Sequence, residues 1–284
     1  MTARIIHTIK ELRDRLNAVP RAVVSVGLVP TMGALHAGHR RLIEQSARDN
    51  GCTVVSVYVN PIQFNAAGDY QSYPRALADD VRLCGEAGAA FVFAPSTEEM
   101  YPQPQRSFVE VETLTDGLCG AFRPGHFRGV ATVVLKLFNI VEPDVAYFGE
   151  KDAQQLAVIR RMVADLNLQL RVVGVPIVRE EDGLAMSSRN RHLSLDERRI
   201  APAIYQALLR AQARIAEGIS DPAQITVEAI SQIELHGLRV EYFEIVDVHS
   251  MQSVDRIAGP VLVATAAWLG STRLIDNIRC GPNS

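Results

Sequence analysis

The chain has 284 residues, which is long enough for one large domain or two domains of ordinary size. Its 48% hydrophobic and 21% charged residues are typical of a globular protein, and a formal net charge of -3 gives no electrostatic case for a nucleic-acid partner. No apolar run approaches membrane-spanning length, and the four cysteines show neither disulfide nor metal spacing, so we expect a cytoplasmic protein with reduced thiols and no membrane partner.

Strands and helices are predicted to alternate through the N-terminal part of the chain. The strand patterns cover residues 22–28, 53–59, 90–94, 108–112, 144–148 and 170–175. The helix patterns cover residues 9–18, 40–48, 74–87, 130–141 and 152–166, and Gly68 and Asp69 are expected in a polar loop. This alternation indicates a parallel sheet with helices on both faces.

The pattern changes after Pro176. A loop extends to Asn190, two helices are expected at 196–217 and 222–236, and strands follow at 238–246, 261–267 and 273–278. Helices followed by a run of strands are typical of an α+β domain. The chain is therefore predicted to be α/β, with a parallel-sheet domain at 1–176 and a smaller α+β domain at 177–284.

Two histidines, His36 and His39, lie between the first predicted strand of the sheet and the helix that follows it. Ligands of open α/β sheets bind where strands give way to helices. The spacing of the histidines brings their rings to one face of a helix, and Gly38 between them lets a flat ligand approach the backbone. Imidazole donors beside a helix N-terminus suit the charge that builds up on phosphate during nucleotidyl transfer.

Taken alone, the H-x-G-H pattern of residues 36–39 also fits two surface histidines on an ordinary βα turn. Because a strand precedes the pattern and a helix follows it, a functional histidine pair and two surface histidines become equally good interpretations. The motif resembles the H-x-G-H signature of the nucleotidyltransferase superfamily, which includes the class I aminoacyl-tRNA synthetases. By itself it names no substrate.

A second strand-to-helix junction, at residues 148–152, carries Lys151. Gly149 allows close backbone approach, and a lysine at a helix start adds a positive charge for phosphate. Gln155 follows four residues later and is expected on the same helical face. The alternative for this segment alone is a common βα turn with a solvated lysine.

The hydroxyl-rich loop at residues 184–190 is the third candidate phosphate site. Ser187, Ser188 and Arg189 can hold a polyphosphate, the arginine binding two oxygens at once. The alternative is a serine-bearing linker between domains. The loop resembles the K-M-S-K-S signature of the same superfamily but has Ala185 and Arg189 at the two lysine positions, which shifts the phosphate grip onto Lys151 and Arg189.

Two carboxamides, Asn60 and Gln63, end the second predicted strand of the sheet. Amide side chains often cap a strand end, which is one interpretation. The other is that they hold an acid substrate, because neutral donors orient a carboxylate without the strong ground-state stabilisation that an arginine would give.

Six segments together closely resemble the pantothenate synthetase (pantoate–β-alanine ligase) family and occur in that family's order. They lie at residues 30–39, 59–64, 73–75, 123–130, 148–152 and 186–190. The resemblance implies a Rossmann-like domain followed by a smaller domain that closes over the site, and a cytoplasmic homodimer. It also implies ATP-dependent condensation of pantoate with β-alanine through a pantoyl adenylate, releasing AMP and diphosphate.

The resemblance also implies site residues. His39 would be the proton donor, with His36 and Lys151 stabilising charge, and Gln63 would contact both pantoate and β-alanine, while Gln155 and Asn60 would hold pantoate. ATP would contact Met32, Gly33, Ala34, Leu35, His36, Ala37, Gly38, His39, Gly149, Glu150, Lys151, Asp152, Val178, Met186, Ser187, Ser188 and Arg189. Mg²⁺ would be carried by ATP, with no metal ligand expected from the protein.

Two other functions remain as alternatives. An adenylyltransferase acting on a phosphate monoester would share the H-x-G-H turn but should place basic residues, rather than Asn60 and Gln63, around the acceptor. A non-enzymatic, RNA-binding relative of a tRNA synthetase would need a basic surface. The formal net charge of -3 argues against this alternative.

Overall fold

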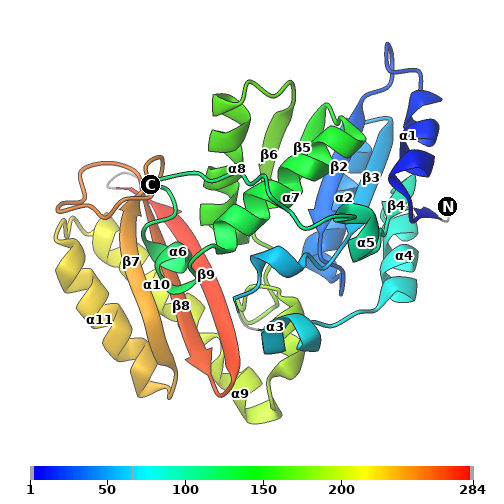
Figure 1. Cartoon of the computed structure of the whole chain (residues 1–284). Helices are drawn as coiled ribbons and strands as arrows, with labels where there is room; N and C mark the ends of the chain where they lie inside the picture. Colours follow the sequence, from blue (N-terminus) through cyan, green and yellow to red (C-terminus); the bar gives the residue numbers. More distant parts are fainter. Residues whose placement is uncertain (1–2, 66, 282–284) are drawn as a thin grey trace. The chain divides into compact units, whose positions relative to one another are not determined.

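The structure is a computed structural model that describes residues 3–65 and 67–281, and its contacts divide the chain into two units (Figure 1). The N-terminal unit comprises Met1–Val111, Arg123–Glu150 and Val158–Pro176. The C-terminal unit comprises Glu112–Phe122, Lys151–Ala157 and Ile177–Ser284. Among the described residues, no helix combines the length and apolar character needed to cross a membrane.

The N-terminal unit is built on a six-stranded sheet with the order β1-β4-β3-β2-β5-β6, in which each described pairing is parallel (Figure 1). The strands are β1 (Arg4–Ile6), β2 (Val26–Thr31), β3 (Cys52–Val57), β4 (Phe91–Phe93), β5 (Val145–Gly149) and β6 (Arg171–Val175). The parallel sheet that the sequence predicts is therefore confirmed.

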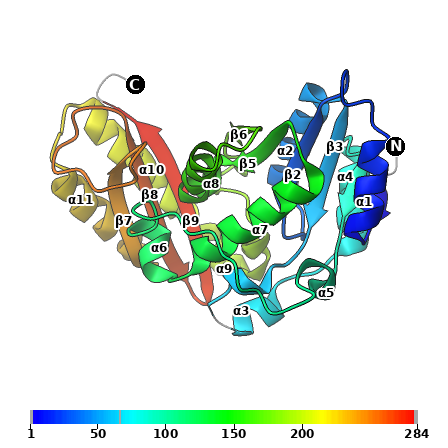
Figure 2. The same ribbon diagram turned by 45° about the horizontal axis from the view of Figure 1, so that its top comes forward.

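Helices cover both faces of this sheet. On one face α2 (Ala37–Asp49) and α4 (Leu77–Glu86) share a core with Val29 and Val55. Leu28 and Val54 are also fully buried and, because successive residues of a strand alternate, they point to the opposite face. On that side α1 (Ile9–Asn17) packs against α7 (His126–Val141), as Figure 2 shows.

The C-terminal unit contains an antiparallel sheet of β7 (Arg239–Asp247), β8 (Val261–Leu269) and β9 (Thr272–Cys280). Two helices, α10 (Ala203–Ala216) and α11 (Pro222–Leu235), bury one face of it, and α6 (Leu118–Phe122) contacts the other (Figure 2). The remaining helical segments are η1 (Pro61–Gln63), α3 (Ala67–Ser72), α5 (Thr97–Met100), η2 (Glu150–Asp152), α8 (Ala153–Asp165), η3 (Ser188–His192) and α9 (Leu195–Ile200).

The strand predicted at 22–28 is displaced in the structure to Val26–Thr31. Val23 and Val24 both donate their amide N–H to the Pro20 carbonyl in a turn, and Val23 is 83% exposed. Pro30 lies inside the strand, where a proline is normally excluded. It is tolerated because the ladder with β5 ends at Leu28, so that no hydrogen bond is lost on that side.

Five other features differ from the predictions. Gly68 and Asp69 lie in α3 rather than in a loop, and the next helix begins at Leu77 instead of Pro74. Residues 108–112 form no strand, because Val109 donates its amide N–H to the Thr132 hydroxyl instead of to a neighbouring strand. The helix predicted at 196–217 is broken at Pro202 into α9 and α10, and the short edge strand β1 was not predicted.

Candidate active site

The two histidines cap the helix that they precede. His36 is the N-cap of α2, so the helix begins at Ala37, earlier than the predicted Arg40. The Nδ1 atom of His36 accepts from the Gly38 amide at 3.1 Å, and the Nδ1 atom of His39 accepts from the His36 amide at 3.4 Å. The imidazole pair thus forms a capping box, with ring centroids 4.1 Å apart.

This capping box determines the tautomer of both rings. A nitrogen that accepts a hydrogen bond carries no proton, so in this arrangement Nε2 is the nitrogen of each ring that carries the hydrogen. Each imidazole can therefore act as a donor from Nε2 while its Nδ1 is engaged with the backbone. The predicted grouping of His36 and His39 at one helix start is confirmed by this geometry.

The turn before the histidines has an unusual backbone. Gly33 and Ala34 both have left-handed conformations, with φ values of 82° and 51°. The Ala34 and Leu35 amides donate to the carboxylate of Asp80, and both residues are buried. Because those amides are engaged within the protein, a contact of Ala34 or Leu35 with a nucleotide would use other atoms.

The two predicted carboxamides lie against each other and against the histidine turn. Asn60 and Gln63 are 1% and 7% exposed, and Asn60 Nδ2 donates to Gln63 Oε1 at 3.0 Å. Gln63 Nε2 lies 3.1 Å from the Met32 sulfur, so the structure brings Gln63 to the predicted ATP turn. Tyr101 donates its hydroxyl to Asn60 Oδ1 at 2.9 Å, and burial raises the pKa of Tyr101, which keeps that donor protonated.

The backbone of Gln63 is held by the start of α7. His126 Nδ1 donates to the Gln63 carbonyl at 2.8 Å, and Arg123 Nη1 donates to His126 Nε2 at 3.2 Å. A Cβ atom at Gly129 would lie 2.6 Å from Gln63 Cα, so only glycine permits this approach. A cavity of about 170 Å³ beside Gln63 is lined by Phe64, Asn65, Phe108, His126 and Arg128 among others.

In the C-terminal unit, the backbone of Lys151 is tied to the edge of the sheet. Asn277 on β9 donates its side-chain amide to the Lys151 carbonyl at 2.9 Å. The neighbouring Asp276 is 4% exposed and pairs with Arg179 through two bonds of 2.6 and 3.0 Å. Burial raises the pKa of the Asp276 carboxyl, and the guanidinium of Arg179 opposes that rise.

The predicted phosphate loop folds back on itself in the same unit. Met186 donates its amide to the Val178 carbonyl at 2.9 Å, which brings two predicted ATP residues together. Ser187 caps the short η3 helix by accepting from the Arg189 amide at 3.3 Å. Ala185 is buried and pairs with Arg179 in a β-bridge, so the position where the superfamily signature has its first lysine points into the protein.

Lys151 and Gln155 were predicted to share one α-helical face. Lys151 instead lies in the 3₁₀ turn η2, and α8 begins only at Ala153. A 3₁₀ turn advances by a different angle per residue, so four-residue spacing across this junction does not set a common face. The predicted residues Gly149 and Glu150 belong to the N-terminal unit, whereas Lys151, Asp152 and Gln155 belong to the C-terminal unit.

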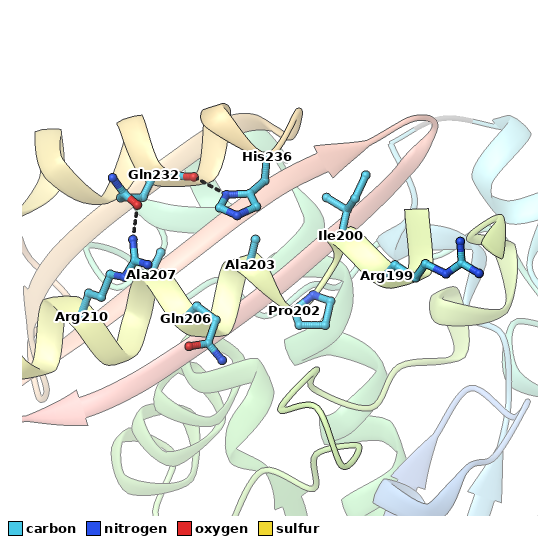
Figure 3. Close-up of a pocket in the computed structure, with 9 residues that line it drawn as sticks. All are labelled: Arg199, Ile200, Pro202, Ala203, Gln206, Ala207, Arg210, Gln232 and His236. Carbon is cyan, nitrogen blue, oxygen red and sulfur yellow. Dashed lines mark hydrogen bonds between the residues drawn. The ribbon is translucent and has the colours of Figure 1, made fainter. Parts of the chain in front are cut away.

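A second cavity, of about 230 Å³, lies among α9, α10 and α11 (Figure 3). Its lining includes Pro202, Ala203, Arg210, Gln232 and His236, and it contains none of the residues that the sequence predicts for the site. Within residues 3–65 and 67–281, no group of three or more histidine, cysteine, aspartate or glutamate side chains could hold a metal ion.

Three site-supporting residues, Asp80, Tyr101 and His126, have no signal in the sequence that marks their role. Asp80 lies near a helix N-terminus, where an acidic residue is common. Tyr101 follows a four-residue helix without a motif of its own. His126 belongs to the basic loop that resembles the ligase family, but its contact with Gln63 spans 63 residues of sequence.

The whole chain resembles proteins of one family. The family model described as pantoate-beta-alanine ligase matches residues 4–279. A pantothenate synthetase of Heliobacterium modesticaldum is 53% identical over 278 residues, covering 97% of this chain and 98% of the relative. A pantothenate synthetase of Acetivibrio thermocellus is 49% identical over 276 residues, covering 97% of this chain and 98% of the relative.

Solved structures of the same family are also similar to this chain. The pantothenate synthetase of Thermus thermophilus superposes with a TM-score of 0.88 at 46% identity, covering 97% of this chain and 98% of that one. A pantoate-beta-alanine ligase from Francisella tularensis, complexed with beta-gamma ATP and beta-alanine, gives a TM-score of 0.83 at 34% identity, covering 97% of each chain. The resemblance inferred from the six motifs is thereby confirmed, and the chain belongs to the pantoate–β-alanine ligase family.

Proposed function

We propose that this chain joins pantoate to β-alanine in two steps, through a pantoyl-adenylate intermediate, with ATP as the activating substrate. The observation that supports this most is the imidazole pair at the start of α2, which offers two Nε2–H donors beside a helix N-terminus. A carboxylate does not react with an amine at neutral pH because its leaving group would be an oxide. Activation must therefore precede amide formation.

In the first step a pantoate carboxylate oxygen attacks the α-phosphorus of ATP, and the bond to the departing diphosphate breaks. Negative charge develops on the phosphoryl oxygens during this transfer. His36 and His39 donate to those oxygens, and Lys151, Ser187, Ser188 and Arg189 bind the phosphates in this proposal. With Nδ1 of His39 accepting from the His36 amide, the Nε2–H of His39 is the group that donates a hydrogen bond to these oxygens.

The acid substrates are assigned to the carboxamides. Gln63 Nε2 carries two hydrogens, and the Met32 sulfur takes one of them, so the other can orient an oxygen of pantoate or β-alanine. Asn60, itself held by Tyr101, fixes the orientation of the Gln63 amide, and Gln155 is a further pantoate ligand in this proposal. The small cavity beside Gln63 is of a size for a compact amino acid.

In the second step the uncharged amine of β-alanine attacks the acyl carbon of the adenylate. The bond from that carbon to the bridging oxygen breaks, AMP leaves with the oxygen, and the amine loses its proton. Water would destroy the adenylate, so we propose that residues 177–284 act as a lid during the reaction.

Mg²⁺ binds most often through substrate phosphates and one or two carboxylates, retaining several waters. We assign the ion to the ATP phosphates, where it would neutralise charge. We further propose that the enzyme is a cytoplasmic homodimer.

Diphosphate release measured with each substrate omitted in turn tests this function. With ATP and pantoate alone we expect about one equivalent of diphosphate per active site, and with β-alanine added we expect continuous turnover. Release that requires phosphopantetheine instead of pantoate would identify the adenylyltransferase alternative. A salt-dependent shift of RNA mobility without diphosphate release would identify the RNA-binding alternative.

A further inference from the structure

Asp80, on α4, is a buried carboxylate that serves the turn leading to the histidines. It is 2% exposed, and each of its two oxygens accepts one backbone amide. Oδ1 accepts from Leu35 at 2.7 Å and Oδ2 accepts from Ala34 at 3.0 Å. These donors immediately precede His36, although Asp80 follows them by more than 40 residues in the sequence.

The turn needs such a partner because of its conformation. Gly33 and Ala34 are consecutive left-handed residues, and an alanine in that region is strained. Successive backbone N–H groups in a turn can converge on an anion, and here the Ala34 and Leu35 amides both donate to the Asp80 carboxylate. Thr31 accepts from the Gly33 amide at 3.2 Å, but the next two amides would be buried without a partner if Asp80 were absent.

We infer that Asp80 is a positioning residue for the nucleotide: its carboxylate fixes the turn at Gly33 and Ala34, so that α2 begins at His36 with the imidazole capping box in place. This inference rests on the proposed function of His36 and His39. The proposed role of Asp80 involves no direct contact with substrate. It acts on ATP only through the backbone from Ala34 to His36.

Gly33 also lies very close to the Asp80 carboxylate. A Cβ atom at Gly33 would lie 2.9 Å from Asp80 Oδ2 and 3.0 Å from a methyl of Val57. The contact between the turn and Asp80 therefore leaves no room for a side chain at Gly33. A purely structural role for Asp80 would lower stability without singling out one substrate.

Asp80→Asn tests the inference, because it keeps the shape of the side chain but turns one acceptor into a donor that faces a backbone N–H. We expect the equilibrium dissociation constant for ATP, measured without pantoate or β-alanine, to rise about tenfold or more. The KM values for pantoate and β-alanine should change less than threefold. Asp79→Asn is the matched control, since Asp79 is the exposed neighbour that pairs with Arg82.

Asp80→Ala is the second variant. It leaves the Ala34 and Leu35 amides without their acceptor and should give the same selective loss of ATP affinity, and thermal unfolding shows whether each variant is folded at the temperature of the binding measurement. Asp80→Asn with a lowered Tm but wild-type ATP affinity would assign a structural role only and overturn the inference. Wild-type protein that fails to bind ATP would instead refute the proposed function, so the two failures are distinguishable.

Discussion

Replacement of His39 by alanine should lower kcat by about a hundredfold or more, the usual cost of losing a positioned donor to a developing phosphoryl charge. His39 is the third residue of α2, and its Nδ1 accepts from the His36 amide. The substitution removes the Nε2 donor and half of the capping box together. The measurement is steady-state AMP formation at saturating ATP, pantoate and β-alanine.

His39→Gln separates these two losses. Glutamine at this helix position can accept from the N-cap amide, so the helix start is retained without the imidazole. We expect His39→Gln to unfold close to the wild-type temperature and to be as slow as His39→Ala. His249→Ala, at an exposed histidine of the C-terminal unit, is the control with unchanged turnover. A wild-type kcat in His39→Gln would show that the His39 imidazole has no role in the reaction.

Asp276→Ala should reduce the free energy of unfolding by about 3–5 kcal/mol, because it leaves a largely buried guanidinium without its carboxylate. The side chains of Arg179 and Asp276 are 18% and 3% exposed and share two hydrogen bonds. In this variant Arg179 still donates to the Gly183 and Asn277 carbonyls and lies over the Tyr205 ring. Because these contacts remain, we expect the loss of unfolding free energy toward the lower end of that range. Urea unfolding of the purified chain measures it.

The double variant Arg179→Met with Asp276→Leu shows whether the loss of stability comes from the unpaired charge of Arg179 or from the altered side chain at position 276. Replacing both partners removes the unpaired charge, so most of the stability should return. Asp196→Ala, which breaks an exposed pair with Arg199, is the control with little change. If Asp276→Ala unfolds at the same urea concentration as Asp196→Ala, the buried pair does not stabilise the C-terminal sheet.

The fold was predictable where periodicity alone decides it. The β-branched run at residues 53–57 and the apolar run at 145–148 both form buried parallel strands as expected. The errors came from contacts that a local pattern does not contain. Pro30 fits inside β2 only because its neighbour β5 stops pairing at Leu28, and the hydroxyl of Thr132 takes the amide that would have made residues 108–112 a strand.

The site was predictable at the level of motifs. The histidine pair, Asn60 and Gln63 were identified because their residue types and positions match a chemistry, and the structure places Met32 against Gln63. The residues that hold them were not identifiable. Asp80 and His126 act across 45 and 63 residues of sequence, through backbone groups that carry no sequence signal.

The most direct test of the two-step reaction uses pantoate labelled with oxygen-18 in both carboxylate positions. Attack of that carboxylate on the α-phosphorus makes one labelled oxygen the bridge of the adenylate, and cleavage by β-alanine leaves it on AMP. We predict that each AMP carries one labelled oxygen and each pantothenate retains one in its amide carbonyl. Label in inorganic phosphate, or unlabelled AMP formed together with pantothenate, would contradict activation through an adenylate.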